Sequence, residues 1–401
     1  MADNNENKVL NVPHLRFPEF SGEWKKHSLG EIGETIIGLT YKPSDVVDNN
    51  GIIVFRSSNI KNGMIDYSDL VRVNKHIKDK IITKENDILV CARNGSQRLI
   101  GKNAIIKQED ANNTFGAFMM VYRANDNPFI LPLLSTKKYF SQVGENLGAR
   151  INQITTSDFN GFEFYFPENH AERTKIAELF RLLDERIATQ NKIIEKLQSL
   201  IKGLIDDIIT LKCGQLVAFE TLYSKAGEGG TPTTSNTEFY DNGSIPFIKI
   251  DDLSNKYLSA NKDYITELGL KKSSAWLIPT HSIIYSNGAT IGAISINKYP
   301  VCTKQGILGI VPNTNIDVEF LYYFMQSSYF QKEVERVVTE GTMKTAYLKD
   351  INHIKCPIPD LDRQKEISHL LSVLSLKEDV ERQLLQKYQI QKQYLLRKMF
   401  I

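Results

Sequence analysis

The chain has 401 residues, a length that predicts two or three domains, each with a core of its own. Apolar residues make up 41% and charged residues 24%, which excludes a disordered, collagenous or membrane-embedded chain. Because the net charge is only +2, the whole molecule does not coat nucleic acid through bulk positive charge, and any DNA contacts must come from locally arranged groups.

The first part of the chain contains short segments rich in β-branched and aromatic residues, separated by Gly, Asn and Pro: 51–55, 87–91, 104–107 and 117–122. Such segments predict strands. We therefore expect residues 1–168 to form a mixed, strand-rich domain.

Residues 169–211 predict one long helix. Apolar residues recur at alternating three- and four-residue steps, with one polar member, in the series Ile176, Phe180, Leu183, Ile187, Gln190, Ile194, Leu197, Ile201, Leu204, Ile208 and Leu211. At about 1.5 Å per residue, this helix is a rod of roughly 60 Å. Because such a rod is longer than a small domain, the pattern favours a coiled coil over an amphipathic helix that lies on a globular body.

The same kinds of segment then recur. Strands are predicted at 244–250, 282–285, 293–296 and 306–311, which gives a second strand-rich domain over 212–361. A second long helix follows at 362–401, with the stripe Ile367, Leu371, Leu374, Leu385, Tyr388, Leu395 and Met399. Glu378, Glu381 and Lys392 interrupt the stripe and predict a stutter near Lys377 to Val380. The two helices can pair with each other, but periodicity leaves their direction open.

The two halves of the chain are similar to each other. The segment from Asp158 to Leu179 has a counterpart from Asp350 to Leu370, at an offset of 191 when Ile176 is aligned with Ile367. The pair Asn94-Gly95 after one predicted strand is matched by Asn287-Gly288 after another. The sequence therefore predicts an α+β fold with an internal repeat: two mixed, strand-rich domains separated by two long helices.

The sequence offers few signs of catalysis. The glycine-rich run 227–232 lacks the Lys-Ser/Thr of a phosphate loop, and the seven histidines form no HExxH. Four scattered cysteines, Cys91, Cys213, Cys302 and Cys356, have no zinc-ligand spacing, and neither a leader segment nor a run of about 18 apolar residues occurs. We expect a non-enzymatic chain without metal or bound cofactor, in a reducing cytoplasm and away from membranes.

Local basic and polar groups are the candidates for DNA contacts. The stretch 72–84 has a net charge of +4, and Lys78 and Lys80 in it are candidate phosphate contacts, although a solvated charge run is the alternative. Polar loops after strands carry Arg, Asn, Gln and Ser, which match base edges, although ordinary turns also favour Asn-Gly. The candidates in these loops are Arg56, Ser58, Asn59, Arg93, Asn94, Ser96, Gln97, Arg98, Arg150, Asn152, Lys249, Asp251, Ser286, Asn287, Thr290, Lys304, Gln305, Lys344 and Thr345.

Several motifs together resemble a known family. The run Gly229-Gly230-Thr231-Pro232, followed by Phe239-Tyr240 and by Ile245 to Leu253, resembles the start of a target-recognition domain in the DNA-specificity subunits of type I restriction-modification systems. The run from Gly38 to Pro43 resembles a second variant of that start. The helical segments beginning at Glu172 and Arg363 resemble the conserved regions of the family, so the resemblance covers essentially the whole chain.

The resemblance implies a non-catalytic subunit in which an antiparallel coiled coil separates two target-recognition domains related by a pseudo-twofold. Each domain would bind one half of a bipartite, asymmetric site on double-stranded DNA. Two methyltransferase subunits carrying S-adenosylmethionine and the restriction (translocase) subunits would be the partners. The alternatives are a coiled-coil scaffold that bridges two protein partners and, third, a stand-alone DNA-modifying enzyme.

Overall fold

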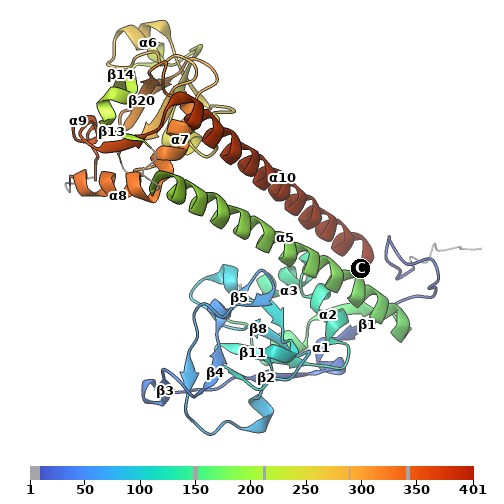
Figure 1. The fold of residues 1–401 in the computed structure, drawn as a ribbon. Helices are drawn as coiled ribbons and strands as arrows, with labels where there is room; N and C mark the ends of the chain where they lie inside the picture. Colours follow the sequence, from blue (N-terminus) through green and yellow to red (C-terminus); the bar gives the residue numbers. More distant parts are fainter. Residues whose placement is uncertain (1–9, 148–151, 211–213, 289, 340–343) are drawn as a thin grey trace, which may run out of the picture. The chain divides into compact units, whose positions relative to one another are not determined.

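The chain divides into two compact units (Figure 1), seen here in a computed structural model that describes residues 10–147, 152–210, 214–288, 290–339 and 344–401. Unit 1 comprises Met1–Gln190 and Leu384–Ile401, and unit 2 comprises Asn191–Gln383. The sequence predicted 169–211 and 362–401 as segments separate from the two domains. In the structure, each long helix instead contributes one half to each unit.

Unit 1 is built on two four-stranded sheets, ordered β2-β11-β8-β9 and β10-β4-β7-β3, and two strand pairs, β1-β12 and β5-β6. Its strands are β1 (Lys25–Ser28), β2 (Glu34–Ile37), β3 (Val46–Val47), β4 (Ile52–Phe55), β5 (Ile60–Lys61), β6 (Met64–Ile65), β7 (Arg72–Val73), β8 (Ile88–Cys91), β9 (Asn103–Ile105), β10 (Thr114–Phe115), β11 (Met119–Arg123) and β12 (Glu163–Phe166). Its short helices are α1 (Leu29–Ile32), α2 (Asn127–Leu133), α3 (Lys137–Leu147) and α4 (Thr156–Asn160).

Unit 2 contains a four-stranded sheet ordered β14-β20-β17-β18, a three-stranded sheet ordered β16-β15-β19 and the pair β13-β21. Its strands are β13 (Gln215–Ala218), β14 (Tyr223–Glu228), β15 (Ile245–Ile248), β16 (Asp263–Ile265), β17 (Ile283–Ser286), β18 (Ile294–Ile296), β19 (Cys302–Thr303), β20 (Ile307–Pro312) and β21 (Lys355–Ile358). Its short helices are α6 (Glu267–Lys271), α7 (Val318–Gln326), α8 (Ser328–Val337) and α9 (Leu348–Ile351). The strands predicted in both halves of the sequence are confirmed, with bounds shifted by a few residues at most.

The main four-stranded sheets of the two units have the same strand order. The central strand β8 pairs antiparallel with β11 and β9, as β17 does with β20 and β18. The parallel pair β10-β4 in unit 1 has its counterpart in the parallel pair β15-β19 of unit 2. The repeat that the sequence predicted is therefore present in the order and direction of the strands.

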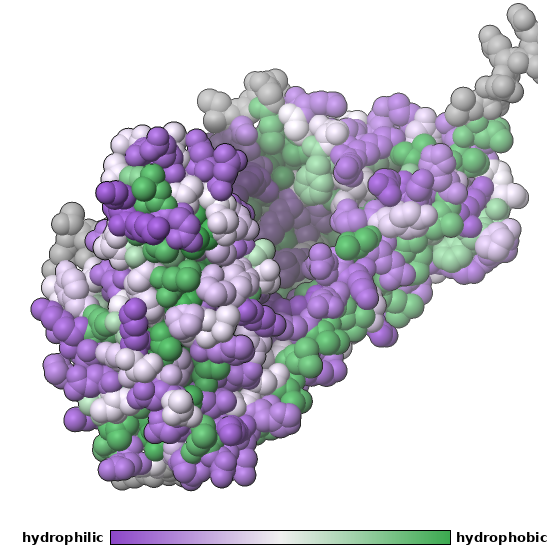
Figure 2. Space-filling view, turned by 90° about the horizontal axis from the view of Figure 1, so that it is seen from above, coloured by the Kyte–Doolittle hydropathy of each residue, from purple (hydrophilic) through white to green (hydrophobic). Residues whose placement is uncertain are grey.

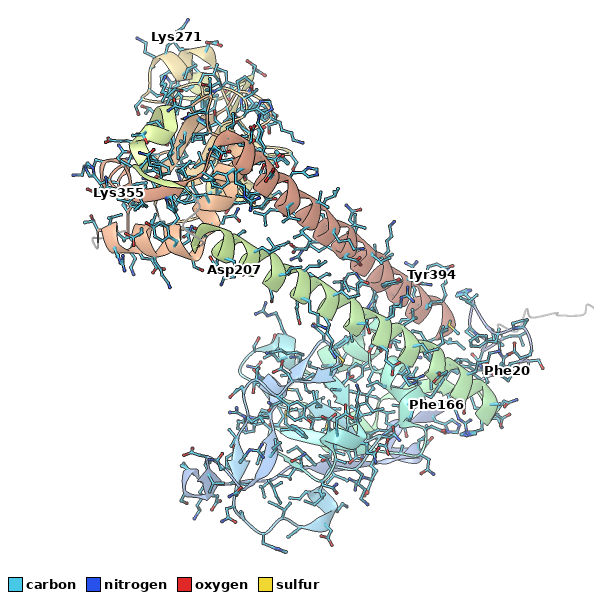
Figure 3. The ribbon with its side chains drawn as sticks, viewed as in Figure 1. Phe20, Phe166, Asp207, Lys271, Lys355 and Tyr394 are labelled. Atoms are coloured by element: carbon cyan, nitrogen blue, oxygen red, sulfur yellow. The ribbon has the colours of Figure 1, made fainter. Side chains whose placement is uncertain are left out.

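Two long helices, α5 (His170–Thr210) and α10 (Leu361–Met399), take part in the core of both units. In unit 1 the ring of Phe180 packs against that of Phe400, with centroids 5.6 Å apart, and Arg186 Nε donates to Tyr388 Oη at 2.9 Å. Phe166, at the end of β12, belongs to the same core cluster (Figure 3). In unit 2, Ile201 and Ile205 of α5 share a cluster with Ile367 and Leu371 of α10.

The helix halves run antiparallel within each unit, because higher numbers in α5 meet lower numbers in α10. Gln198 Nε2 donates to Glu378 Oε1 at 3.0 Å in unit 2, and Lys392 pairs with Asp184 in unit 1. The polar residues that interrupt the second stripe therefore occupy the seam and find polar partners. The predicted stutter near Lys377 to Val380 is wrong, because Leu374, Glu378, Glu381 and Leu385 keep the alternating four- and three-residue steps of the seam, and Glu381 is buried.

A buried polar side chain holds the start of each long helix. Glu172 is fully buried on α5 and accepts hydrogen bonds from Arg16 at 2.7 Å. At the matching place on α10, Gln364 accepts the N–H of Asp317 and donates to the carbonyl of Pro359. Unpaired burial of such groups costs several kcal/mol, so these bonds fix the helices to the units. Within the described ranges, no helix combines the length and apolarity needed to cross a membrane.

Candidate nucleic-acid interface

Three loops of unit 1 meet where β8 ends. The N–H groups of Ala92 and Arg93 both donate to the carbonyl oxygen of Phe118, at 3.0 Å each. The N–H of Ile154 donates to the carbonyl of Ala92 at 2.9 Å. We call these four residues the unit 1 frame. It joins the loop after β8 to the turn before β11 and to the segment before α4.

Unit 2 contains the same arrangement. The N–H groups of Asn287 and Gly288 donate to the carbonyl of Gly306, at 3.1 and 3.2 Å, and the N–H of Ala346 donates to the carbonyl of Asn287 at 2.9 Å. We call these four residues the unit 2 frame. In this register Asn287 corresponds to Ala92.

The alignment of Asn94-Gly95 with Asn287-Gly288 is therefore wrong in structural terms. Strand β8 ends at Cys91 and β17 ends at Ser286, so the frame begins directly after each strand. The Asn-Gly pair in unit 1 lies two residues further along its loop. Similar residue pairs arose at different places because both loops need turn residues.

A glycine passes the end of β10 in unit 1 and the end of β19 in unit 2 at close range. A Cβ added to Gly38 would lie 2.2 Å from the carbonyl oxygen of Gly116, and one added to Gly229 would lie 2.1 Å from that of Thr303. These two glycines begin the motifs that carried the family resemblance. They are required because the chain passes against backbone that has no room for a side chain.

The loop after β8 presents Arg93, Gln97 and Arg98 as exposed side chains. Among the described residues, none of the three makes a side-chain hydrogen bond or ion pair that would have to be broken. Guanidinium and amide groups can donate to guanine and adenine edges. These three are the candidate base contacts that the structure leaves available in this loop.

Other predicted residues of this loop are engaged within it. The Asn94 amide donates to Ser57 Oγ at 2.9 Å and accepts the N–H of Ser96 at 2.9 Å. Asn152, at a positive φ of 54°, donates to the carbonyl of Gly95 at 3.1 Å. Asn94 and Asn152 thus fix the loop, while Arg150 lies outside the described residues.

The turn after β4 divides its three candidates between surface and interior. Ser58 is exposed, and Arg56 pairs with Asp69 at 2.8 Å. Asn59 is fully buried and donates to the carbonyls of Asp66 and Asp69 at 3.0 and 2.8 Å. The prediction for Asn59 is therefore corrected: its amide supports the turn and is not available to a base.

The basic stretch 72–84 is partly neutralised by residues distant in sequence. Lys75 lies 3.4 Å from Asp45, and Lys80 lies 3.3 Å from Glu34. The backbone N–H of Lys42, and next Lys75, hold the pKa of Asp45 below its usual value, so this carboxylate stays charged at neutral pH. Lys78 is exposed and has no ion pair within the described part of the chain.

In unit 2 the two candidates directly after β17 are buried. Ser286 and Asn287 are 0% and 1% exposed, and the Asn287 amide donates to the carbonyl of Ala346 at 3.1 Å. Both predictions are corrected, because both side chains are buried, and the Asn287 amide supports the unit 2 frame from inside. The exposed candidates beside them are Thr290, Lys304, Gln305 and Lys344, with Thr345 half-buried.

The last two candidate DNA contacts, Lys249 and Asp251, lie on the turn after β15. Lys249 pairs with Asp263 at 2.8 Å, whereas Asp251 is exposed. The N–H of Lys304 donates to the carbonyl of Ile248 at 3.0 Å, as Gly116 donates to Phe55 in unit 1. The frame of unit 2 is thereby joined to this turn, and the candidate contacts from 249–251 and 304–305 belong to one region.

Phe118 was not among the predicted contacts. Its side chain is 59% exposed, and the guanidinium carbon of Arg93 lies 5.2 Å from its ring centroid. The sequence places Phe118 inside a predicted apolar strand at 117–122. In the structure β11 begins one residue later, so Phe118 belongs to the turn of the frame. No periodicity distinguishes it from the buried residues that follow.

Buried thiols add no reactive group to these regions. Burial raises the pKa of Cys91 and of Cys302 to about 11, and that of Cys356 to about 12. Cys213 lies outside the described residues. Among those that are described, no group of three or more His, Cys, Asp and Glu could hold a metal ion. Exposed hydrogen-bonding and cationic side chains therefore lie on the unit 1 frame, at Arg93, and beside the unit 2 frame, at Lys304 and Gln305.

Comparisons with known proteins agree on one family. A family model for the "type I restriction modification DNA specificity domain" matches residues 21–199 and 223–388. The chain is 28% identical over 215 residues to the EcoR124I/EcoR124II specificity subunit of Escherichia coli, an alignment that covers 51% of this chain and 53% of that relative. It is 23% identical over 406 residues to the HindI specificity subunit of Haemophilus influenzae, covering 80% and 86% of the two chains. The S subunit structure from M. genitalium shares the fold, with a TM-score of 0.60 and 17% identity over 97% of this chain and 99% of that one.

Proposed function

The chain belongs to the type I restriction-modification DNA specificity family, and we propose that each of its units reads one half of a bipartite, gapped DNA target. As a specificity subunit with two target-recognition domains, it serves sequence recognition of DNA. The observation that carries the finer proposal is the frame that occurs once in each unit. Exposed polar and cationic side chains lie on or beside each frame, with Arg93, Gln97 and Arg98 in unit 1 and Lys304 and Gln305 in unit 2, and such groups read base edges.

The two frames present different side chains. Unit 1 has Arg93 and Phe118 where unit 2 has Gly288 and Gly306, and unit 2 has Lys304 where unit 1 has Gly116. The two frames have the same backbone hydrogen bonds but different residues at matching positions, which supports the reading of two unrelated half-site sequences. We therefore propose an asymmetric target, read by two domains related by a pseudo-twofold repeat.

We propose that α5 and α10 form an antiparallel coiled coil that sets the gap between the half-sites. The support is the antiparallel pairing of their halves within each unit, together with the buried or half-buried positions that recur every three or four residues over 176–205 and 367–399. A base pair rises about 3.4 Å along DNA, so a rod of fixed length specifies a fixed number of uncontacted pairs.

The same helices are the proposed docking platform for two methyltransferase subunits, which would carry S-adenosylmethionine, and for the restriction (translocase) subunits that join them. On α10, Val373, Leu376 and Val380 are 52%, 64% and 49% exposed and recur every three or four residues. Figure 2 shows apolar (green) residues scattered among polar (purple) ones, and a single exposed apolar side chain marks no binding site. Three exposed apolar side chains on one face of α10 are instead suited to packing against a helix of a partner. The chain itself would bind no cofactor and act in the cytoplasm, without catalysis of its own.

The target itself gives the direct test. The subunit is combined with the methyltransferase subunit of its system, and DNA methylated by the complex is sequenced. We expect methylated adenine in a gapped, non-palindromic motif. Modification only in palindromic or ungapped motifs would falsify the proposal.

Lys78→Ala should weaken binding of the complex to all DNA sequences alike and reduce the slope of log K against log salt by about one, because one phosphate contact is lost. Lys80→Ala should change the slope less, since Glu34 already neutralises that charge. Gln97→Ala serves as the matched control: it should relax one half-site and leave the slope unchanged. Titration of fluorescent duplexes at several salt concentrations measures all three, and equal slopes for wild type and Lys78→Ala would contradict the assignment.

A further inference from the structure

Phe118 is an exposed aromatic residue on a rigid turn. Its carbonyl accepts two N–H groups, and two residues earlier the N–H of Gly116 donates to the carbonyl of Phe55 at 3.0 Å. The backbone on both sides is thus fixed, while 59% of the side chain remains exposed. The ring therefore points outward from a defined position beside the candidate contacts of unit 1.

The ring restrains Arg93. The guanidinium carbon lies 5.2 Å from the ring centroid, which is within cation–π distance. The Arg93 N–H is also bonded to the Phe118 carbonyl, so the two residues are tied at backbone and side chain. The cation–π contact uses the face of the guanidinium and none of its N–H donors in a hydrogen bond. Within the described residues the guanidinium makes no hydrogen bond or ion pair. Its N–H groups remain available to a ligand.

Resting on the function proposed above, we propose that Phe118 is a positioning residue that holds Arg93 to read a guanine in the half-site of unit 1. Arginine matches guanine because two of its N–H groups can donate to O6 and N7 together. A side chain restrained before binding loses less rotamer entropy on contact. Unit 2 has glycines at both positions, so only one half-site contains a guanine read in this way.

The experiment uses the complete complex with its methyltransferase and duplexes that carry the motif found by methylation sequencing. Each guanine of the two half-sites is replaced in turn by 7-deazaguanine, which lacks the N7 acceptor. For wild type we expect one replacement, in one half-site, to weaken binding about 10-fold, the effect of losing one good base contact. Arg93→Ala should bind the unmodified duplex about 10-fold more weakly and be insensitive to that replacement.

Phe118 is tested by a pair of substitutions. Phe118→Leu keeps an apolar side chain but no ring face, and should lose most of the sensitivity to 7-deazaguanine at that base. Phe118→Tyr should restore it, a rescue that a merely structural role would not require. Phe140→Leu changes another exposed phenylalanine, on α3, and should behave as wild type.

Two results would overturn the inference. One is Phe118→Leu with the full sensitivity of wild type, which would separate Phe118 from Arg93. The other is an equal loss of affinity for all duplexes, including unrelated ones, which would make Arg93 a phosphate contact. Failure of the proposed function is distinguishable, because then no gapped motif would be found in the first place.

Discussion

Gly38→Ala is expected to disrupt the unit 1 frame and to abolish recognition of one half-site. The added Cβ would lie 2.2 Å from the carbonyl oxygen of Gly116 and 2.4 Å from that of Phe115, distances that real Cβ atoms do not adopt. Both obstacles are backbone atoms, one in the last residue of β10 and one just before the turn that contains Phe118, so neither can swing aside as a side chain would. Overpacking of this kind costs typically 1–3 kcal/mol and more where the backbone must move, so we expect about 3 kcal/mol.

The matched control is Gly95→Ala in the neighbouring loop, where an added Cβ meets nothing within 4 Å. Chemical denaturation of the purified chain should show a lower free energy of unfolding for Gly38→Ala and a nearly unchanged one for Gly95→Ala. Gly229→Ala should affect unit 2 in the same way and impair the other half-site. If Gly38→Ala had the same free energy of unfolding as wild type and recognised the same DNA target, the frame would not be the element that supports recognition.

The parts of the fold that follow one periodic pattern could be predicted from the sequence. The helix predicted at 169–211 is α5, His170–Thr210, and the one predicted at 362–401 is α10, Leu361–Met399. Their seams repeat a simple step over many turns, so each residue adds to the same signal. Glu378 and Glu381 interrupt the apolar stripe but not the seam, because seam positions can hold polar residues that find partners.

The frames could not be predicted, because their bonds join backbone groups far apart in the chain. The hydrogen bonds are those from the Ala92 N–H to the Phe118 carbonyl and from the Ile154 N–H to the Ala92 carbonyl. They use backbone groups that every residue except proline has. No residue type marks them. The Asn-Gly motifs, which are visible in the sequence, pointed to Asn287, and this residue is buried in the structure.

The charge available at 72–84 depends on acidic residues that are distant in sequence. The stretch 72–84 is strongly basic as a sequence, but Glu34 and Asp45 come from other strands and turns to lie beside Lys80 and Lys75. A local count omits such partners. Which lysines remain available for phosphates is decided by the fold, and the answer differs from one lysine to the next.

Deletion of one heptad from each long helix is expected to shorten the gap of the DNA target and to leave both half-sites unchanged. The matched segments are 184–190 in α5 and 386–392 in α10. They contain both sides of the Asp184–Lys392 and Arg186–Tyr388 contacts, and none of their residues belongs to the main apolar cluster of unit 1. Each seam keeps its alternation of three- and four-residue steps across the deletion.

The double deletion removes roughly 10 Å of helix, which corresponds to at most about three base pairs. Methylation sequencing with the altered subunit measures the new motif. Deleting only one of the two segments is the control: the remaining helix would face partners one heptad out of register, so we expect loss of sequence-specific methylation rather than a new gap. An unchanged gap in the double deletion, with activity retained, would show that the spacing is not set by the helices, and altered half-sites would contradict the assignment of sequence reading to the two frames.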